Sequence, residues 1–149
     1  MIEEYLEKQG AEFEVIRHER AYTAQETAQV EDISGYEFAK TVVVTVSDGH
    51  CLLVLQAPYR VDLDKVSAVL GEEAELTPED ETKPLFPSCE LGAEPPFGSV
   101  FEMPTIVESR LEEEEEIVFR AGTHEKTIKM PYVEYKRIEQ PRVADFAAE

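Results

Sequence analysis

Two apolar segments joined by a short turn constrain the fold of this chain more than any other feature. Residues 40–46 contain four valines and two threonines, and residues 51–56 form a second apolar run. The intervening residues 47–50 include Asp48-Gly49, a pair that is typical of the turn in a β-hairpin. We therefore expect a hairpin whose two strands are apolar enough to lie in the centre of a sheet.

Start and stop residues predict short helices on both sides of this hairpin. Asp62 is placed to cap a helix that Gly71 would end. The Thr23-x-x-Glu26 spacing is typical of a capping box, which would open a second helix. The other helices are expected at residues 2–9, after a cap at Thr77-Pro78, and at residues 132–138.

The remaining segments predict short strands with hairpin-like spacing. These strands are expected at residues 13–17, 106–107, 117–119 and 126–130. Residues 84–98 hold four prolines and two glycines, too many breakers for a regular element, and the five glutamates at 112–116 predict a solvated loop. The expected fold is therefore a single α+β domain over residues 1–149, with a mostly antiparallel sheet and short helices around it.

Charge and cysteine content restrict the classes of function. The chain has 33 acidic residues against 14 Lys plus Arg, a net charge of −19, whereas nucleic-acid-binding proteins usually carry a basic surface. Its apolar runs are too short to cross a membrane, and its acidic N-terminus is unlike a signal peptide. Cys51 and Cys89 form neither a disulfide framework nor a metal motif. We expect a cytoplasmic protein with no membrane partner and with Cys51 in the core.

Four short motifs resemble those of the YbaK family, which includes the editing domain of prolyl-tRNA synthetases, and they occur in the same order as in that family. The resemblance runs from about residue 18 to residue 130, and order and spacing make it more specific than any single motif. The motifs are His18 followed by Thr23-Ala24-Gln25-Glu26, then Ala39-Lys40-Thr41, then Gly92-x-x-x-Pro96, and finally Ala121-Gly122 followed by His124.

This resemblance implies a Greek-key-like, barrel-like sheet of mixed strands and an editing activity. Family members remove a wrong amino acid from the 3′ end of tRNA, so the expected reaction is trans-editing hydrolysis, with Ala- or Cys-tRNA(Pro) as substrate. The expected partner is the 3′ end of aminoacyl-tRNA, with a synthetase as a further partner left open and DNA excluded. An aminoacyl ester is already reactive, so no metal or cofactor is expected.

Lys40 is the first catalytic candidate, because it stands where the chain enters an apolar strand. Its ammonium could hold the terminal phosphate or ribose, or polarise the ester. On the residues alone, a lysine at a strand end with its ammonium in solvent is the favoured reading. The family resemblance favours the catalytic one.

The Gly92–Pro96 loop and His124 are the other catalytic candidates. The loop could offer backbone N–H groups to the ester carbonyl, or it could be an ordinary surface turn. In the family, a histidine at the place of His124 limits the pocket or orients the amino group, although a lone histidine is often structural. The candidate catalytic residues are Lys40, Gly92 and His124, and the candidate substrate-binding residues are Ala93, Pro95, Pro96, Gly98, His18 and Thr23.

The attacking group is expected to be water assisted by the ribose 2′-hydroxyl, or the substrate's own thiol when the amino acid is cysteine. Two other functions remain open at this stage. The charge of −19 favours a non-catalytic YbaK-like module that binds a protein or a small ligand. A third reading is hydrolysis of a smaller acyl ester or amide without RNA. Salt dependence separates them, because binding to phosphates weakens steeply as salt rises.

Overall fold

The predicted hairpin forms the centre of the molecule. In the computed structural model, which describes residues 1–17 and 34–149, strands β2 (Ala39–Val46) and β3 (Gly49–Gln56) pair antiparallel over their whole length. Every residue of β3 from Cys51 onward is buried, as the sequence predicted for a central strand. Cys51 is 5% exposed and lies in the core as expected.

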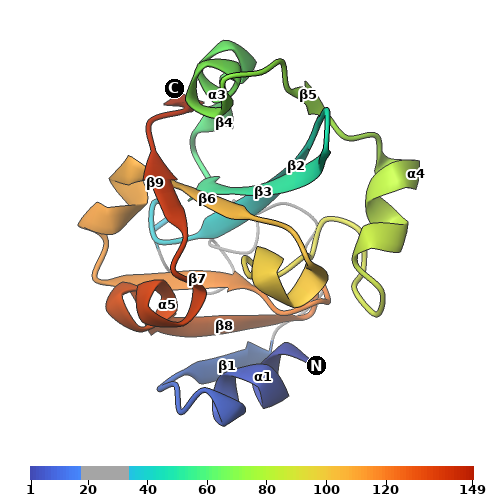
Figure 1. Cartoon of the computed structure of the whole chain (residues 1–149). Coiled ribbons are helices and arrows are strands. Elements are labelled where there is room, and N and C mark those ends of the chain that lie inside the picture. The colour runs from blue at the N-terminus through green and yellow to red at the C-terminus, as the bar shows by residue number, and fades with distance from the viewer. Residues whose placement is uncertain (18–33) are drawn as a thin grey trace.

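Three sheets make up the fold, which is α+β and mostly antiparallel as predicted (Figure 1). The only parallel pairs among the named strands of the described residues are β3–β6 and β6–β9. The first sheet has the order β5 (Glu75–Leu76), β2, β3, β6 (Thr105–Glu108) and β9 (Arg142–Ala144). The second has the order β1 (Glu14–Arg17), β8 (Lys126–Pro131) and β7 (Glu116–Arg120), and the third pairs β10 (Ala147–Ala148) with β4 (Arg60–Val61). In the described part of the chain these sheets do not close into a barrel, which corrects the barrel-like outline.

The helices confirm some of the predicted caps and correct others. The Asp62 side chain accepts hydrogen bonds from the first turn of α3, and Gly71 ends that helix with a left-handed φ of 72°. Thr77 does not cap the next helix, because its hydroxyl bonds Thr45 across the sheet at 2.8 Å. The helices are α1 (Ile2–Lys8), α3 (Leu63–Leu70), α4 (Glu79–Thr82) and α5 (Tyr132–Glu139), with 3₁₀ turns at Lys83–Leu85, Gly98–Phe101 and Ser109–Glu113.

Two other predictions need comment. The glutamates at 112–116 are mostly exposed, as expected, but only Glu114 and Glu115 form a loop, because the first two end a 3₁₀ turn and Glu116 begins β7. The helix predicted from Thr23 and Glu26 lies outside the described residues. Within residues 1–17 and 34–149, no helix has the length and apolar character needed to span a bilayer.

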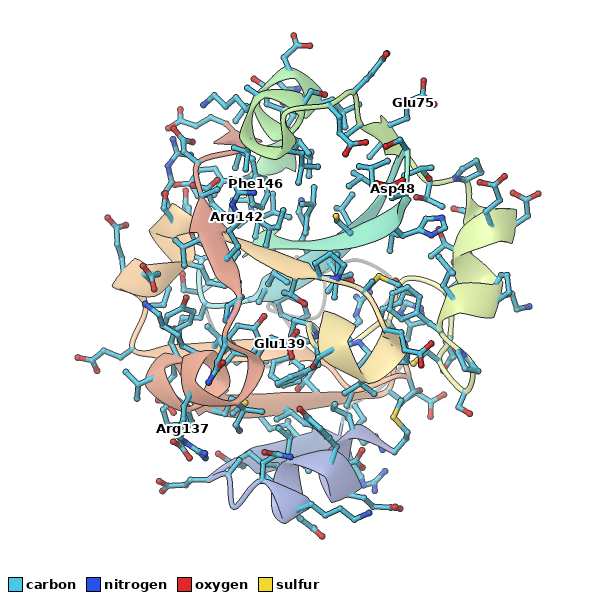
Figure 2. All side chains as sticks on the ribbon, in the orientation of Figure 1. Asp48, Glu75, Arg137, Glu139, Arg142 and Phe146 are labelled. Carbon is cyan, nitrogen blue, oxygen red and sulfur yellow. The ribbon has the colours of Figure 1, made fainter. Side chains whose placement is uncertain are left out.

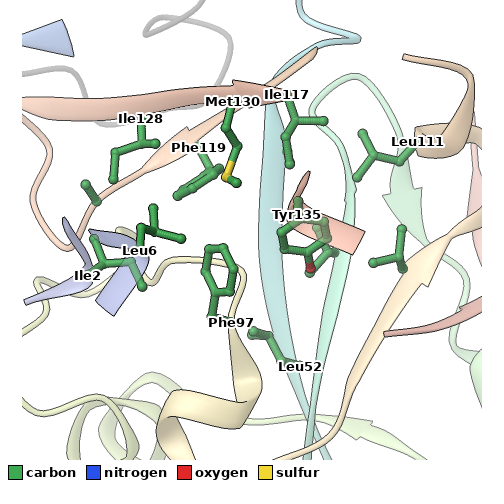
Figure 3. Close-up of a cluster of buried hydrophobic side chains, with 14 of the residues drawn as sticks. Ile2, Leu6, Leu52, Phe97, Leu111, Ile117, Phe119, Ile128, Met130 and Tyr135 are labelled. Carbon is green, nitrogen blue, oxygen red and sulfur yellow. The ribbon is translucent and has the colours of Figure 1, made fainter. Parts of the chain in front are cut away.

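The main core fixes the loop that contains Gly92. Phe97 packs edge-on against Phe119 and Tyr135, with ring centroids 5.6 and 5.1 Å apart (Figure 3). The buried Tyr135 hydroxyl donates a hydrogen bond of 2.7 Å to the Pro96 carbonyl oxygen. Helix α5 therefore holds the C-terminal end of this loop. A second apolar cluster, which includes Phe146, lies beneath α3 (Figure 2).

Candidate active site

A cavity of about 180 Å³ opens between the start of β2 and the loop at residues 92–94. Pockets for drug-sized ligands have volumes of about 300–1,000 Å³, so this one suits a small group such as an aminoacyl moiety. The cavity is lined by one aromatic ring, small groups and three ionisable side chains. The described lining residues are Phe38, Ala39, Lys40, Thr41, Gly92, Glu94 and Arg120.

Lys40 lies in the wall of this cavity. Its Nζ donates a hydrogen bond of 3.0 Å to the carbonyl oxygen of Ala57. Burial lowers the pKa of the Lys40 ammonium below its usual value. An ammonium has three N–H donors, and the bond to Ala57 uses one of them. Lys40 is therefore not a strand-end lysine in open solvent, and its ammonium can serve a ligand in the cavity.

The loop at residues 92–94 is attached to two strands beside the cavity. The Thr41 hydroxyl of β2 donates to the Glu94 carbonyl oxygen at 3.2 Å. Arg120, at the end of β7, donates from Nη1 to the Gly92 carbonyl oxygen at 3.2 Å. Gly92 has a φ of +84°, a conformation that side-chain-bearing residues rarely adopt. Both strands thus hold the loop in place, and the structure brings Lys40 and Gly92, two of the predicted site residues, to the same cavity.

Glu94 is an ionisable residue of the cavity that the sequence reasoning missed. Its side chain is 8% exposed, and its Oε2 accepts a hydrogen bond of 2.7 Å from the Gly92 N–H. Burial raises the pKa of the Glu94 carboxyl, although neighbouring N–H groups and His124 act in the opposite direction. A buried carboxylate beside a cavity attracts a cationic group of a ligand.

The backbone donors of this loop are engaged within the protein. The Gly92 N–H binds the Glu94 carboxylate, and the Ala93 N–H donates to the Glu90 carbonyl oxygen at 3.0 Å. Pro95 and Pro96 have no N–H to offer. The Gly92 and Ala93 N–H groups are therefore engaged, with the loop's own carboxylate in the position of an anion, and polarisation of the ester by this loop stays a prediction.

His124 lies behind the loop and is not among the described residues that line the cavity. It is 5% exposed, and its Nε2 lies 2.8 Å from the Leu91 carbonyl oxygen. Since a carbonyl only accepts, Nε2 carries the proton in this bond. A Cβ atom added at Gly92 would lie 3.4 Å from the ring carbon Cε1 of His124. His124 therefore packs against Gly92 and positions the loop.

The other predicted residues support the loop or lie outside the description. Ala93, Pro95, Pro96 and Gly98 are buried but are not among the described lining residues. Gly98 is required by packing, because a Cβ there would lie 2.6 Å from the Met103 carbonyl oxygen. His18 and Thr23 lie outside the described residues.

Five lining residues had not been named as candidates: Phe38, Ala39, Thr41, Glu94 and Arg120. For Arg120 a signal was present, since this cation ends an apolar strand much as Lys40 begins one. Arg120 is 7% exposed, and its guanidinium lies 5.8 Å from the centre of the Phe38 ring. No comparable local signal distinguishes Glu94 among the 33 acidic residues.

Comparison with known proteins gives a consistent set of relatives. The sequence profile of the aminoacyl-tRNA editing domain matches residues 18–138. The multifunctional Ser/Thr-tRNA deacylase ProXp-y of Escherichia coli K12 is 29% identical over 147 residues, covering 95% of this chain and 87% of the relative. The same protein from Escherichia coli O157:H7 gives the same match.

Two crystal structures share the fold. The hypothetical protein APE2540 superposes with a TM-score of 0.91 at 19% identity, covering 99% of both chains. A candidate trans-editing enzyme for prolyl tRNA synthetase superposes with a TM-score of 0.89 at 22% identity, covering 99% of this chain and 95% of the other.

Proposed function

The chain belongs to the aminoacyl-tRNA editing domain family and deacylates aminoacyl-tRNA, and we propose that its substrate carries a small hydroxyl amino acid, serine or threonine. The observation that carries this proposal is the small cavity in which Lys40, Thr41 and Glu94 meet. The names of the Escherichia coli relatives support it, since they refer to Ser/Thr-tRNA. The comparisons give no support to the alanine or cysteine substrates expected from the sequence, and these become competitors in the test.

Lys40 is the cation that would stabilise the developing negative charge on the ester carbonyl. The N–H groups of Gly92 and Ala93 are engaged, so this role falls to the Lys40 ammonium. Preorganised charge in a partly desolvated site is usually the largest contribution to such a reaction. Water adds to the carbonyl carbon with help from the ribose 2′-hydroxyl. The bond to the 3′-oxygen then breaks, releasing the amino acid and a tRNA with a free 3′-hydroxyl.

Glu94 would bind the α-ammonium group of the esterified amino acid. An aminoacyl ester has this cation two bonds from the reacting carbonyl carbon, so the substrate would match the charges of Lys40 and Glu94. The ammonium would also relieve the cost of an ionised Glu94 in a buried position. Thr41 lines the same cavity, and its hydroxyl, which donates to the Glu94 carbonyl oxygen, is a candidate acceptor for a serine or threonine hydroxyl.

A single-turnover deacylation assay tests this function. Serine, threonine, alanine, cysteine and proline would each be supplied on tRNA(Pro) and as 3′-adenosine esters. We expect selective release of serine and threonine, and a loss of about 100- to 1,000-fold in rate for Lys40→Ala. Lys83→Ala removes an exposed lysine of the first 3₁₀ turn and serves as the matched control.

Two outcomes would contradict the proposal. Release of serine that is equally fast in Lys40→Ala would remove Lys40 from the mechanism. No release of any amino acid, even with a synthetase added, would favour the non-catalytic binding module.

A further inference from the structure

A pair of aromatic rings, one exposed and one half-buried, lies next to the cavity and has no part in the hydrolysis assigned to Lys40 and Glu94. Tyr36 and Tyr59 meet edge-on with ring centroids 5.7 Å apart. The Arg110 guanidinium lies over the Tyr59 ring, 4.8 Å from its centre. Tyr36 is 47% exposed, which is unusual for a large ring in contact with other side chains. We refer to Tyr36, Tyr59 and Arg110 as the aromatic platform.

Backbone contacts connect this platform to the cavity wall. Tyr36 precedes the lining residue Phe38 by two residues, a span of at most about 7 Å along the chain. The Gln56 side chain donates to the Tyr36 carbonyl oxygen at 3.0 Å. The neighbouring Ala57 donates its N–H to Phe38 at 2.9 Å and accepts the Lys40 ammonium at 3.0 Å. The platform is therefore fixed in place relative to Lys40.

Within the platform, Tyr36 is the ring that solvent reaches most. Tyr59 is half-buried between Tyr36 and the guanidinium of Arg110. A cation over a ring face within about 6 Å is attracted to it, so Arg110 holds Tyr59 in position. Arg110 Nη1 is buried and has no hydrogen-bond partner among the described residues, which is consistent with an arginine placed for its contact with the ring.

We propose that Tyr36 stacks with the terminal base of the single-stranded 3′ end of the substrate tRNA. Proteins recognise unpaired bases by stacking them on exposed aromatic rings, and each stack contributes substantially to binding. The esterified ribose lies at the cavity mouth when the aminoacyl group occupies the cavity. Its own base is then the part of the substrate best placed to reach an aromatic ring beside Phe38. This inference rests on the proposed function.

The charges around the platform favour a base over a phosphate as its ligand. A hollow on the same side is lined by Glu37 and by the glutamates at 113–116. These carboxylates repel phosphates, whereas stacking on an uncharged ring face needs no basic surface. The proposal thus explains how a chain of net charge −19 can hold the end of an RNA. It also predicts a shallow dependence of the KM on salt, since few phosphates are neutralised.

The test compares serine esters with and without a base. Wild type, Tyr36→Leu and Tyr36→Phe would be assayed on seryl-tRNA, on 3′-seryl-adenosine and on serine methyl ester. We expect Tyr36→Leu to lower kcat/KM about 5- to 100-fold on the first two substrates through KM, and to leave the methyl ester unchanged. Tyr36→Phe keeps the ring and should retain the wild-type values. Val133→Ala, at a 73% exposed position on α5, is the control for loss of surface apolar area.

Two results would overturn the stacking role while the enzyme remains active. These are an unchanged kcat/KM for Tyr36→Leu on seryl-adenosine and an equal loss on the methyl ester. If the wild type hydrolyses none of the three esters, the proposed function itself has failed.

Discussion

Two buried carboxylates of this protein have opposite surroundings. Glu108, on β6, is fully buried and accepts four hydrogen bonds, from the backbone N–H groups of Phe146, Ala147 and Arg110 and from the Ser109 hydroxyl. Glu94 is 8% exposed, its Oε2 accepts a bond of 2.7 Å from the Gly92 N–H, and it belongs to the residues that line the cavity. The first carboxylate is satisfied by the fold, whereas burial raises the pKa of the second.

This difference separates a structural group from a candidate functional one. A buried charge is tolerated when hydrogen bonds satisfy it, and it destabilises the fold when they do not. Glu108 connects β6 to the segment before β10 and so fixes the C-terminal end of the chain. Glu94 combines burial with a raised pKa beside a cavity, a combination that is common at sites of binding and catalysis.

The largest expected effect is the loss of stability when Glu108 is removed. Glu108→Ala leaves buried N–H groups of Phe146 and Ala147 without an acceptor, and each such group costs about 1–3 kcal/mol. We expect the free energy of unfolding in urea to fall by about 3 kcal/mol or more. Glu113→Ala removes an exposed glutamate nearby and should change it by less than about 0.5 kcal/mol. Equal effects of the two substitutions would show that the Glu108 bonds contribute little.

Glu94→Gln should change the free energy of unfolding less than Glu108→Ala does, and it should raise it rather than lower it. The amide keeps an acceptor for the Gly92 N–H but removes the buried charge, so we expect a gain of about 0.5–2 kcal/mol at neutral pH. The pKa of Glu94 is raised, so the folded state binds its proton at a higher pH than the unfolded state does. As the pH falls through the raised pKa toward 4.5, folded wild type binds the proton and no longer loses stability to a buried charge. The stability advantage of Glu94→Gln over wild type therefore shrinks.

The measurement is the denaturation midpoint of both proteins at a series of pH values. An advantage that stays constant with pH would show that Glu94 is protonated, or otherwise satisfied, throughout. A loss of stability at neutral pH would place Glu94 in the same class as Glu108.

Local sequence signals predicted the elements whose partners are close in the chain. The hairpin of β2 and β3 follows from β-branched residues and the Asp48-Gly49 turn, and α3 follows from Asp62 and Gly71. The parallel pairs β3–β6 and β6–β9 join strands far apart in sequence, and no local pattern specifies such a partner or its register.

The candidate site was predictable to a similar degree. Lys40 and Gly92 stood out because a strand-end cation and a glycine–proline loop are locally unusual, and the family resemblance placed them together. Glu94 differs from the other acidic residues only in its burial, which depends on the contacts of the folded loop with Thr41 and Arg120. His124 was expected near the substrate, but the structure places it behind Gly92 because its ring bonds the Leu91 carbonyl.

Two substrates that differ in one charge test most directly whether the cavity beside Lys40 and Glu94 binds the α-ammonium of an aminoacyl group. Seryl-tRNA and N-acetylseryl-tRNA would be hydrolysed in single turnover by wild type and by Glu94→Gln, with Lys83→Ala as the control. We expect wild type to hydrolyse seryl-tRNA, which has a free ammonium, faster than N-acetylseryl-tRNA. Glu94→Gln should lose this preference because it hydrolyses seryl-tRNA, but not N-acetylseryl-tRNA, more slowly than wild type does. An unchanged preference in Glu94→Gln would contradict the assignment of Glu94 and, with it, this account of the cavity.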